Sequence, residues 1–555
     1  MKNALVCALG LAATASFAQT TTHKHYEESE AAAKPAPGGE LAPRLLNLGP
    51  HTFKVTTKSK QAQAFVNQGV NLAYGFNHAE AGRAFREAAR LDPGCAMAYW
   101  GQALVLGPNI NAPMTPDDEP KALAAAQKAV SLQSKASPRE RAYIAAVAQR
   151  YSGDAKDRTA RDRAYADAMR DVVRRFPDDL DAATLLAEAL MDLRPWNYWL
   201  RDGRPYAETP EIVANLEQVL ARNPDHPGAN HLYIHALEAN TPEKAEAAAD
   251  RLLKLMPGAG HMVHMPSHIY QRVGRYADAA ASNQAAILAD EDYITQCRAQ
   301  GLYPMAYYPH NVHFLWFAAT ADGQSQLSID SARKTASKVT DELLETLPLL
   351  GSFRIVPWYA LTRFGRWDEM LREPAPADKF PYLRGMWHYS RGLAFLGKDE
   401  LEGAEKELAE VRAIAANPAL NYAMFSPNTA AAILSVAPEV LAGEILARRK
   451  DYDKAVAHLD RAVRLEESLV YTEPSEWHYP PRLALGAVLL AAGRAKEAET
   501  VYWEDLRRNR DNGWALFGLT QALRDQGRSD EAAATQARFE EAWARADVKL
   551  TGSRF

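Results

Sequence analysis

The stretch NQGVNLAYGFNHAEAGRAFREAARLDP, residues 67–93, decides the fold class. Three small residues, one aromatic residue and a proline occupy its defining positions: Gly69, Ala81, Phe85, Ala88 and Pro93. The small residues let two helices approach closely, the aromatic ring fills the groove between them, and the proline ends the second helix. The stretch therefore predicts a helical hairpin.

The same helical sequence pattern continues from residue 62 to residue 545, and it repeats. Turns of the form Gly-Arg-x-x-acidic recur at 274–278, 365–369, 493–497 and 527–531, and the last two begin 34 residues apart. No segment with the period of a β-strand competes. We therefore expect an all-α solenoid of helical hairpins, with one array over 61–320 and a second array with a capping helix over 321–555.

This pattern resembles the tetratricopeptide-repeat (TPR) proteins over most of the chain. The stretches at 75–111, 224–239 and 258–276 are also similar to a little-characterised group of exported bacterial TPR proteins, and the last two distantly resemble tetratricopeptide repeat protein 38. The resemblance implies a TPR-like fold and a concave groove that holds a protein or peptide partner. It implies no particular reaction.

The N-terminus predicts export. Residues 1–18 combine one lysine, a short apolar run and small residues before the end, which is typical of a secretory signal peptide. Residues 19–60 are rich in Thr, Ala, Pro and Gly, so we expect a disordered or loosely attached lead-in. No later run of 18 apolar residues indicates a transmembrane segment. The expected location is the periplasm or the exterior.

Composition narrows the function. The formal net charge is −5 over 555 residues, with no basic stripe, so nucleic acid is not an expected partner. Hydrophobic residues make up 47% of the chain, which is enough for a large core. After signal removal only Cys95 and Cys297 remain, and the sequence leaves open whether they pair.

Histidines gather in one part of the chain. Eight of the fifteen fall within residues 226–313, in HPGANHLYIHALE (226–238), GHMVHMPSHIY (260–270) and YYPHNVHF (307–314). An ordinary TPR has no use for such a set. If 229–239 is helical, His231, His235 and Glu238 share one face. We interpret Pro266 as a helix start, with His261 and His264 in the loop before it, and Pro309 as another.

This pattern predicts a site for a divalent transition metal, because neutral imidazole and carboxylate ligands suit copper, zinc or iron. The candidate ligands are His231, His235, Glu238, His264, His268, His310 and His313. Seven ligands exceed one four-coordinate ion, so either two ions bind or some of these residues support the ligands from behind. Whether the chain is also an enzyme stays open, and the HExxH order of zinc proteases is absent.

Two alternatives remain. In a metal-free TPR scaffold that binds a protein or peptide, the histidines would be buried polar residues satisfied by neighbours such as Tyr233. A metal-free hydrolase would need a nucleophile, but there is no Gly-x-Ser-x-Gly motif, and Ser267 is only a sequence neighbour of His268. The long inserts at 107–120 and 191–209 are candidate walls of a ligand pocket.

Overall fold

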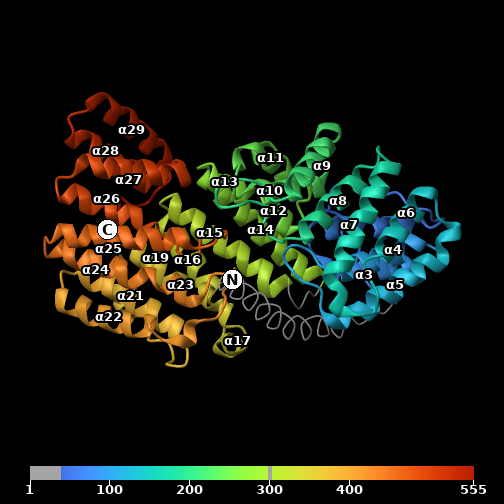
Figure 1. Cartoon of the computed structure of the whole chain (residues 1–555), viewed down its shortest axis with the longest axis horizontal. Helices are drawn as coiled ribbons and strands as arrows, with labels where there is room; N and C mark the ends of the chain where they lie inside the picture. Colours follow the sequence, from blue (N-terminus) through green and yellow to red (C-terminus); the bar gives the residue numbers. More distant parts are fainter. Residues whose placement is uncertain (1–38, 298–302) are drawn as a thin grey trace. The chain divides into compact units, whose positions relative to one another are not determined.

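The computed structural model describes residues 39–297 and 303–555, which form α-helices and short turns (Figure 1). Within these ranges there is no β-strand, and only isolated bridges occur, for example between Asn109 and Ala112. Consecutive helices pack against each other along most of the chain. The prediction of an all-α array of helical hairpins is confirmed. The predicted signal peptide, residues 1–18, lies outside the described residues.

The chain divides into two compact units. We call one of them the histidine-rich unit; its described part comprises residues 39–269, 282–297 and 303–311. The C-terminal unit comprises residues 270–281 and 312–555. The sequence suggested a single boundary at residue 320. It gave no indication that residues 270–281 would belong with the C-terminal part.

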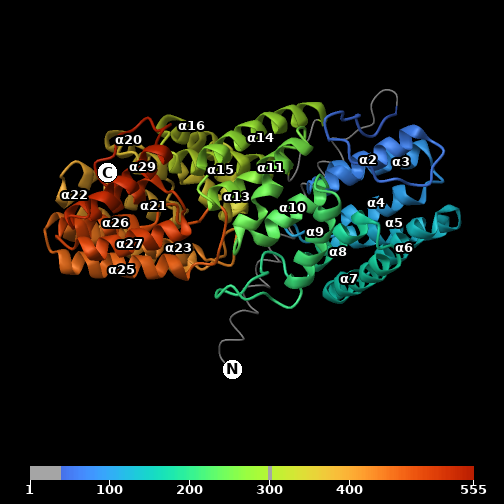
Figure 2. The ribbon, with the colours of Figure 1, turned by 90° about the horizontal axis from the view of Figure 1, so that it is seen from above.

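The histidine-rich unit begins with regular helical hairpins (Figure 2). Its own helices are α2 (Lys60–Tyr74), α3 (His78–Leu91), α4 (Ala96–Leu106), α5 (Glu119–Leu132), α6 (Pro138–Ala148), α7 (Arg158–Arg175), α8 (Leu180–Asp192), α9 (Thr209–Arg222), α10 (Pro227–Leu237), α11 (Glu246–Leu255) and α12 (Gly260–His264). The helices that cross the boundary are α13 (Pro266–Arg272), α14 (Tyr276–Cys297) and α15 (Tyr308–Ala321).

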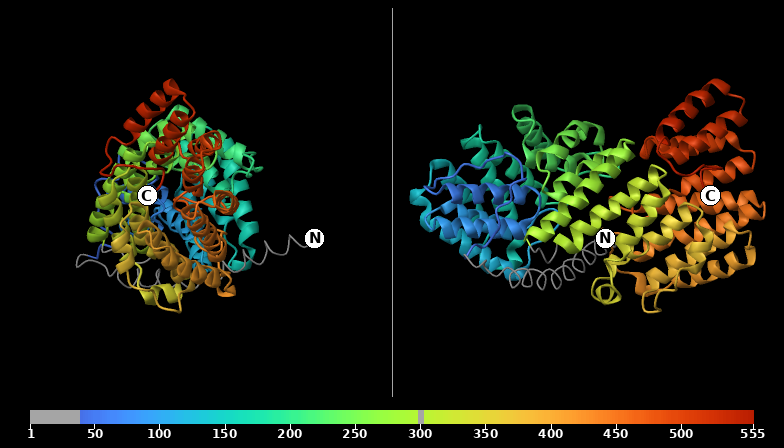
Figure 3. Two further views of the ribbon diagram at one scale, coloured as in Figure 1. Left: turned by 90° about the vertical axis from the view of Figure 1, so that its left-hand side faces the viewer. Right: turned by 180° about the vertical axis from the view of Figure 1, so that it is seen from behind.

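The C-terminal unit is built in the same way (Figure 3). Its helices are α16 (Ser325–Ala336), α17 (Asp341–Thr346), α18 (Gly351–Arg354), α19 (Val356–Arg363), α20 (Trp367–Arg372), α21 (Pro381–Gly397), α22 (Leu401–Ala415), α23 (Ala430–Leu434), α24 (Val436–Arg448), α25 (Tyr452–Ser468), α26 (Pro481–Ala491), α27 (Ala495–Arg508), α28 (Gly513–Asp525) and α29 (Ser529–Ala542).

A large side chain between two glycines holds successive hairpins together. The ring of Phe85 fits between Gly69 and Gly101, where an added Cβ would lie 2.7 Å and 2.3 Å from it. These three positions are 16 residues apart. The same spacing recurs in the C-terminal unit at Gly486, Tyr502 and Gly518. The close packing of an aromatic ring against small residues, inferred from residues 67–93, therefore occurs in both units.

The Gly-Arg turns also adopt the predicted geometry. The glycines at 274, 365, 493 and 527 all have positive φ, between 64° and 86°. This backbone conformation is strained for residues with a Cβ, so glycine is the natural residue at a helix end. The turn signatures thus mark real helix boundaries in both units.

Residues 39–59 differ from the expected disordered lead-in. They form no helix, yet Leu45, Leu48 and Phe53 are buried. Side chains of α2 satisfy the backbone of the segment; for example, Gln68 accepts a hydrogen bond from the Leu45 N–H at 3.0 Å. The composition suggested disorder because the segment has few apolar residues, but those few are docked on the first hairpin. For residues 39–59 that prediction was wrong.

The array of the histidine-rich unit closes on itself. Helix α10 packs against α2, although α10 belongs to a hairpin far along the chain. The turn after α2 also contacts α14, where Tyr293 donates a hydrogen bond to Asn77 Oδ1 at 3.2 Å. This closure brings the histidines of α10 and α12 against the first hairpin.

Among the described residues, one segment is long and apolar enough to cross a membrane by length and composition. It is Ala430–Arg448, and 67% of it is buried inside the molecule. Core helices buried inside a protein share this length and composition.

Candidate metal centre

Helix α10 places two of the predicted histidines on one face. The helix begins at Pro227, and His226 caps it by accepting the Ala229 N–H at Nδ1, 3.1 Å away. His231 and His235 are one turn apart, and their ring centroids lie 4.9 Å from each other. They are only 0% and 2% exposed. The two rings therefore meet in the interior, as their spacing predicted.

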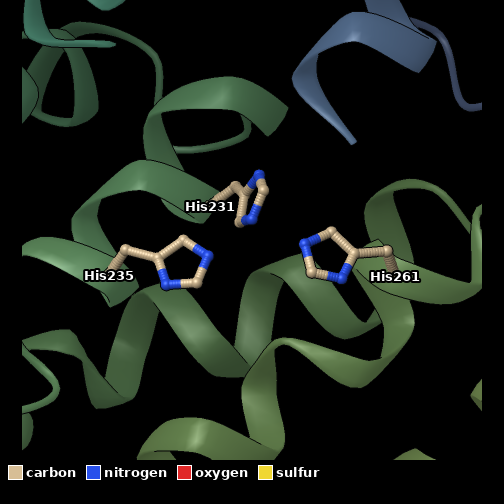
Figure 4. A group of neighbouring side chains, drawn as sticks. All are labelled: His231, His235 and His261. Atoms are coloured by element: carbon tan, nitrogen blue, oxygen red, sulfur yellow. The ribbon is translucent and has the colours of Figure 1, made fainter. Parts of the chain in front are cut away.

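His261 of helix α12 joins these two residues (Figure 4). Its ring centroid lies 4.9 Å from that of His231 and 6.4 Å from that of His235. One ring nitrogen from each residue lies within 4.8 Å of the other two. We call His231, His235 and His261 the first triad.

Hydrogen bonds fix the tautomers of the two α10 histidines. His231 Nδ1 lies 2.6 Å from the carbonyl oxygen of Tyr74, and His235 Nδ1 lies 3.2 Å from Glu238 Oε1. Because both oxygens only accept, each Nδ1 carries the proton and each Nε2 keeps its lone pair. Neither Nε2 has a hydrogen-bond partner, and neither ring nitrogen of His261 has one. Four buried ring nitrogens are thus left unsatisfied.

Burial makes the first triad neutral. It holds the pKa of His231, His235 and His261 well below the ordinary histidine value, and repulsion from neighbouring imidazoles lowers each pKa further. A buried polar atom without a partner costs about 1–3 kcal/mol. Neutral imidazoles with free lone pairs are also the form that binds a metal cation.

A second group of histidines lies beside the first triad. It consists of His264 on α12, His268 on α13 and His310 on α15, with one ring nitrogen of each within 4.8 Å of the others. The His264 ring centroid lies 4.8 Å from that of His268 and 4.9 Å from that of His310. We call these residues the second triad. The closest rings between the triads are those of His235 and His268, 5.6 Å apart.

Glu238 stands between the two triads. It is 1% exposed, and its carboxylate accepts from His235 Nδ1 at 3.2 Å and from His268 Nδ1 at 2.7 Å. The sequence predicted Glu238 as a metal ligand. Its carboxylate oxygens are close enough to His235 and His268 for the three residues to hold a metal ion. Because both oxygens already accept imidazole N–H groups, the geometry instead suits a residue that orients ligands from behind.

Two further histidines lie in places that the sequence did not predict. His313 belongs to none of the candidate groups found among the described residues. It lies in the C-terminal unit, where its ring contacts Trp316 and Phe353 at centroid distances of 5.1 Å and 4.9 Å. His261 was not among the predicted ligands, and both His261 and His264 were expected in a loop before Pro266. That assignment was wrong, since α12 spans Gly260–His264.

Phe76 and Trp196 cover the first triad. Phe76 has a positive φ of 55° and lies with its ring centroid 4.5 Å from that of His231. Trp196 also has a positive φ, 63°, and meets the His235 ring edge-on at 5.0 Å. Phe76 is buried, whereas Trp196 is 45% exposed. Two residues with an unusual backbone conformation therefore flank the triad, and one of them reaches solvent.

Both long inserts reach the neighbourhood of the triad. Trp196 belongs to the insert at 191–209, and Trp199 of the same insert donates a hydrogen bond from Nε1 to the carbonyl of Ala236 at 2.7 Å. Asn111 of the insert at 107–120 hydrogen bonds to the Tyr307 hydroxyl, whose ring lies 4.9 Å from that of His261. Residues of both inserts thus lie near the first triad, and their role as walls of a ligand pocket stays a prediction.

A further group, His51, Asp181 and His226, has the spacing of a metal site but is already satisfied. Asp181 accepts from His51 Nε2 at 3.0 Å, His226 Nε2 at 3.2 Å and the Tyr74 hydroxyl at 2.7 Å. Burial raises the pKa of Asp181, but the hydrogen bonds from the histidines outweigh it and leave the pKa well below the usual range. Since the His226 Nδ1 lone pair also accepts from Ala229, the histidine has no nitrogen left for a metal.

Comparison with known proteins adds no assignment of function. No family model matches the chain, and no curated protein matches it in sequence. Two similar solved structures are the human IFIT1 dimer with m7Gppp-AAAA and the Cut9–Hcn1 hetero-tetramer of the APC/C. The first has 12% identity and a TM-score of 0.31, and covers 88% of this chain and 91% of its own. The second has 11% identity and a TM-score of 0.29, and covers 89% and 76%.

Proposed function

We propose that this chain binds a divalent transition-metal ion at the first triad. The observation that carries the proposal is the set of four unsatisfied ring nitrogens on three buried histidines whose donor atoms lie within 4.8 Å. A cation shared by the three rings would bind the lone pair of one nitrogen from each ring, and the fourth nitrogen, on His261, would carry the proton of that neutral ring. The carbonyl of Tyr74 and the carboxylate of Glu238 act as the acceptors that usually orient metal-bound imidazoles.

The donor set favours zinc, copper or iron. Three imidazole nitrogens suit all of these metals, and no thiolate selects among them: Cys95 and Cys297 are buried free thiols that belong to no candidate group in the described chain. Three protein ligands also leave a coordination position for water or a small ligand. Trp196, the partly exposed neighbour of His235, marks the side from which such a ligand would enter.

Metal content of the purified chain tests this proposal. Untagged protein is stripped with chelator, reloaded with zinc or copper, and analysed by plasma mass spectrometry beside a His231→Ala/His235→Ala variant. A partly exposed histidine of the C-terminal unit, replaced in His458→Ala, provides the matched control. We expect the control to keep its metal and the double variant to lose about one ion per chain. A double variant that folds and keeps the full metal content would contradict the proposal.

We further propose that the chain is exported, on the sequence of residues 1–18 alone. Expression in a Gram-negative host followed by fractionation tests this directly. The mature protein is expected in the periplasmic fraction with a mass that corresponds to cleavage after Ala18. Full-length protein in the cytoplasmic fraction would count against export.

Peptide binding is the second candidate function. A cavity of about 810 Å³ in the histidine-rich unit carries both signs of charge along its lining, including Arg139, Arg175, Asp178 and Asp225. A concave surface of this kind suits a short peptide with charged side chains. Asp225 is exposed, so Asp225→Lys would invert the charge at little cost to folding. A peptide array probed with both proteins is expected to show different preferred charges, and identical binding patterns would argue against this role.

A further inference from the structure

We infer that a second transition-metal ion binds at His264, His268 and His310, next to the ion of the first triad, so that the histidine-rich unit holds a pair of ions. This extends the function proposed above, but it stands on a different observation. The observation is the contact between His264 Nε2 and His268 Nε2, which lie 2.9 Å apart.

The tautomers of these two rings conflict at that contact. His268 Nδ1 faces the carboxylate of Glu238 at 2.7 Å, and His264 Nδ1 faces the amide oxygen of Asn283 at 2.7 Å. The Ser267 hydroxyl also lies 3.4 Å from His264 Nδ1, but the shorter contact of each Nδ1 is to an oxygen that accepts, which favours a proton on Nδ1 of each neutral ring. Each Nε2 then presents a lone pair to the other at hydrogen-bond distance. Such a contact is favourable only if a cation lies between or beside the two nitrogens.

A metal ion accounts for more of the geometry than a shared proton. A proton would join two nitrogens, whereas one ring nitrogen of His310 also lies within 4.8 Å of the pair. Metal–nitrogen bonds of about 2.0–2.1 Å place two adjacent ligands about 2.9 Å apart when the angle at the metal is about 90°. The observed separation of 2.9 Å matches that of two neighbouring ligands on one ion.

Glu238 links the two ions. Its oxygens accept from His235 of the first triad and from His268 of the second. Helix α12 adds a further link, because it carries His261 of the first triad and His264 of the second, with ring centroids 5.9 Å apart. An ion at either triad would fix the orientation of groups that also shape the other. The six donors are all imidazoles, a set that suits copper and zinc.

Copper(II) loading of the full chain tests the inference, with His23 and His25 replaced by alanine so that this pair near the N-terminus does not contribute. We expect two ions per wild-type chain by plasma mass spectrometry, and about one in His264→Ala/His310→Ala or in His231→Ala/His235→Ala. Electron paramagnetic resonance should show the half-field transition of a coupled copper pair in the wild type and in neither variant. Circular dichroism confirms that each variant is folded.

The outcomes separate the two proposals. Loss of the only ion in His231→Ala/His235→Ala, with no change in His264→Ala/His310→Ala, would overturn the second site and leave the first. The opposite pattern would overturn the first site and support the second. Absence of bound metal in the wild type would overturn both.

Asn283 offers a check that does not depend on removing a ligand. Asn283→Asp keeps an acceptor for the His264 Nδ1–H and cannot donate to it, so the metal-bound tautomer is preserved and two ions should bind. If the amide instead donates to His264, so that the two rings share an ordinary hydrogen bond, Asn283→Asp would disturb the apo protein and leave copper binding at one ion. That result would contradict the inference.

Discussion

Glu238 is the residue expected to orient the candidate ligands of both triads. Its carboxylate accepts from two histidines, His235 and His268. In Glu238→Gln the amide nitrogen must face one of these N–H groups, so one ring loses its acceptor and its fixed orientation. We expect metal affinity to fall about 10–100-fold while the fold survives.

Competition with a chromophoric chelator measures this change. Glu217→Gln is the matched control, because Glu217 on α9 accepts a hydrogen bond from Tyr233 on α10, is exposed and belongs to none of the candidate groups among the described residues. An unchanged affinity in Glu238→Gln would show that the carboxylate does not support the ligands.

His313 predicts a pH dependence of stability. Burial lowers its pKa to about 3, compared with 6.5 in an unfolded chain. Below pH 6.5 the unfolded state therefore binds a proton that the native state does not, and stability falls as the pH falls. His313→Phe removes this term and keeps an aromatic ring beside Trp316.

Between pH 7 and pH 5 the wild type should lose about 2 kcal/mol more than His313→Phe in the free energy of unfolding. Urea titrations followed by tryptophan fluorescence at the two pH values measure the difference. Parallel losses in the two proteins would show that His313 is protonated in the native state as readily as in the unfolded one.

At the scale of helices, the glycine and aromatic device makes a prediction about packing. Gly101→Ala would place a Cβ 2.3 Å from the Phe85 ring, so we expect a loss of about 1–3 kcal/mol although alanine favours helix. Gly82→Ala, in the neighbouring helix α3, would make only ordinary contacts of 3.5 Å or more and should stabilise by about 0.5–1 kcal/mol.

A double variant tests whether contact with Phe85 causes the loss of stability in Gly101→Ala. In a Phe85→Leu background the Gly101→Ala substitution should cost less, because the smaller side chain leaves room for the new methyl group. Urea unfolding of the four proteins gives the coupling energy. Strict additivity would mean that contact with Phe85 is not the reason for the glycine.

Individual helices and turns could be predicted from the sequence more readily than the contacts between distant segments. Local rules sufficed for the hairpin at 67–93 and for the Gly-Arg turns, since spacing along the sequence fixes which residues share a helix face. They failed at His261 and His264, which were expected in a loop before the helix start at Pro266, although a short helix spans Gly260–His264. They also failed for residues 39–59, whose few apolar side chains find a surface that only the folded array provides.

The candidate site depends on contacts that no local rule reaches. The acceptor of His231 is the carbonyl of Tyr74, 157 positions earlier in the chain. The sequence could therefore collect the histidines into one region, but it could not separate them into two triads or place Glu238 between them. It also could not exclude His313, which follows His310 at helical spacing yet lies in the other unit.

At the scale of the whole molecule, metal should stabilise one unit selectively. Both triads lie in the histidine-rich unit, and a ligand stabilises the state that binds it by about 2.7 kcal/mol at 100 times its dissociation constant. Hydrogen exchange with and without zinc should show slower exchange in 226–268 and no change in 381–545. Equal protection throughout the chain would contradict a site confined to this unit.

Trp196 gives the protein an optical property of its own. Its indole is partly exposed and stands 5.0 Å from the ring of His235. Copper(II) has an open d shell and quenches a nearby excited indole, whereas zinc(II), with a filled shell, has no such effect. Quenching of this tryptophan should therefore report which metal occupies the first triad, and Trp196→Phe should reduce the copper-dependent quenching without changing occupancy; Trp199, which is bonded to the Ala236 carbonyl, would account for the remainder.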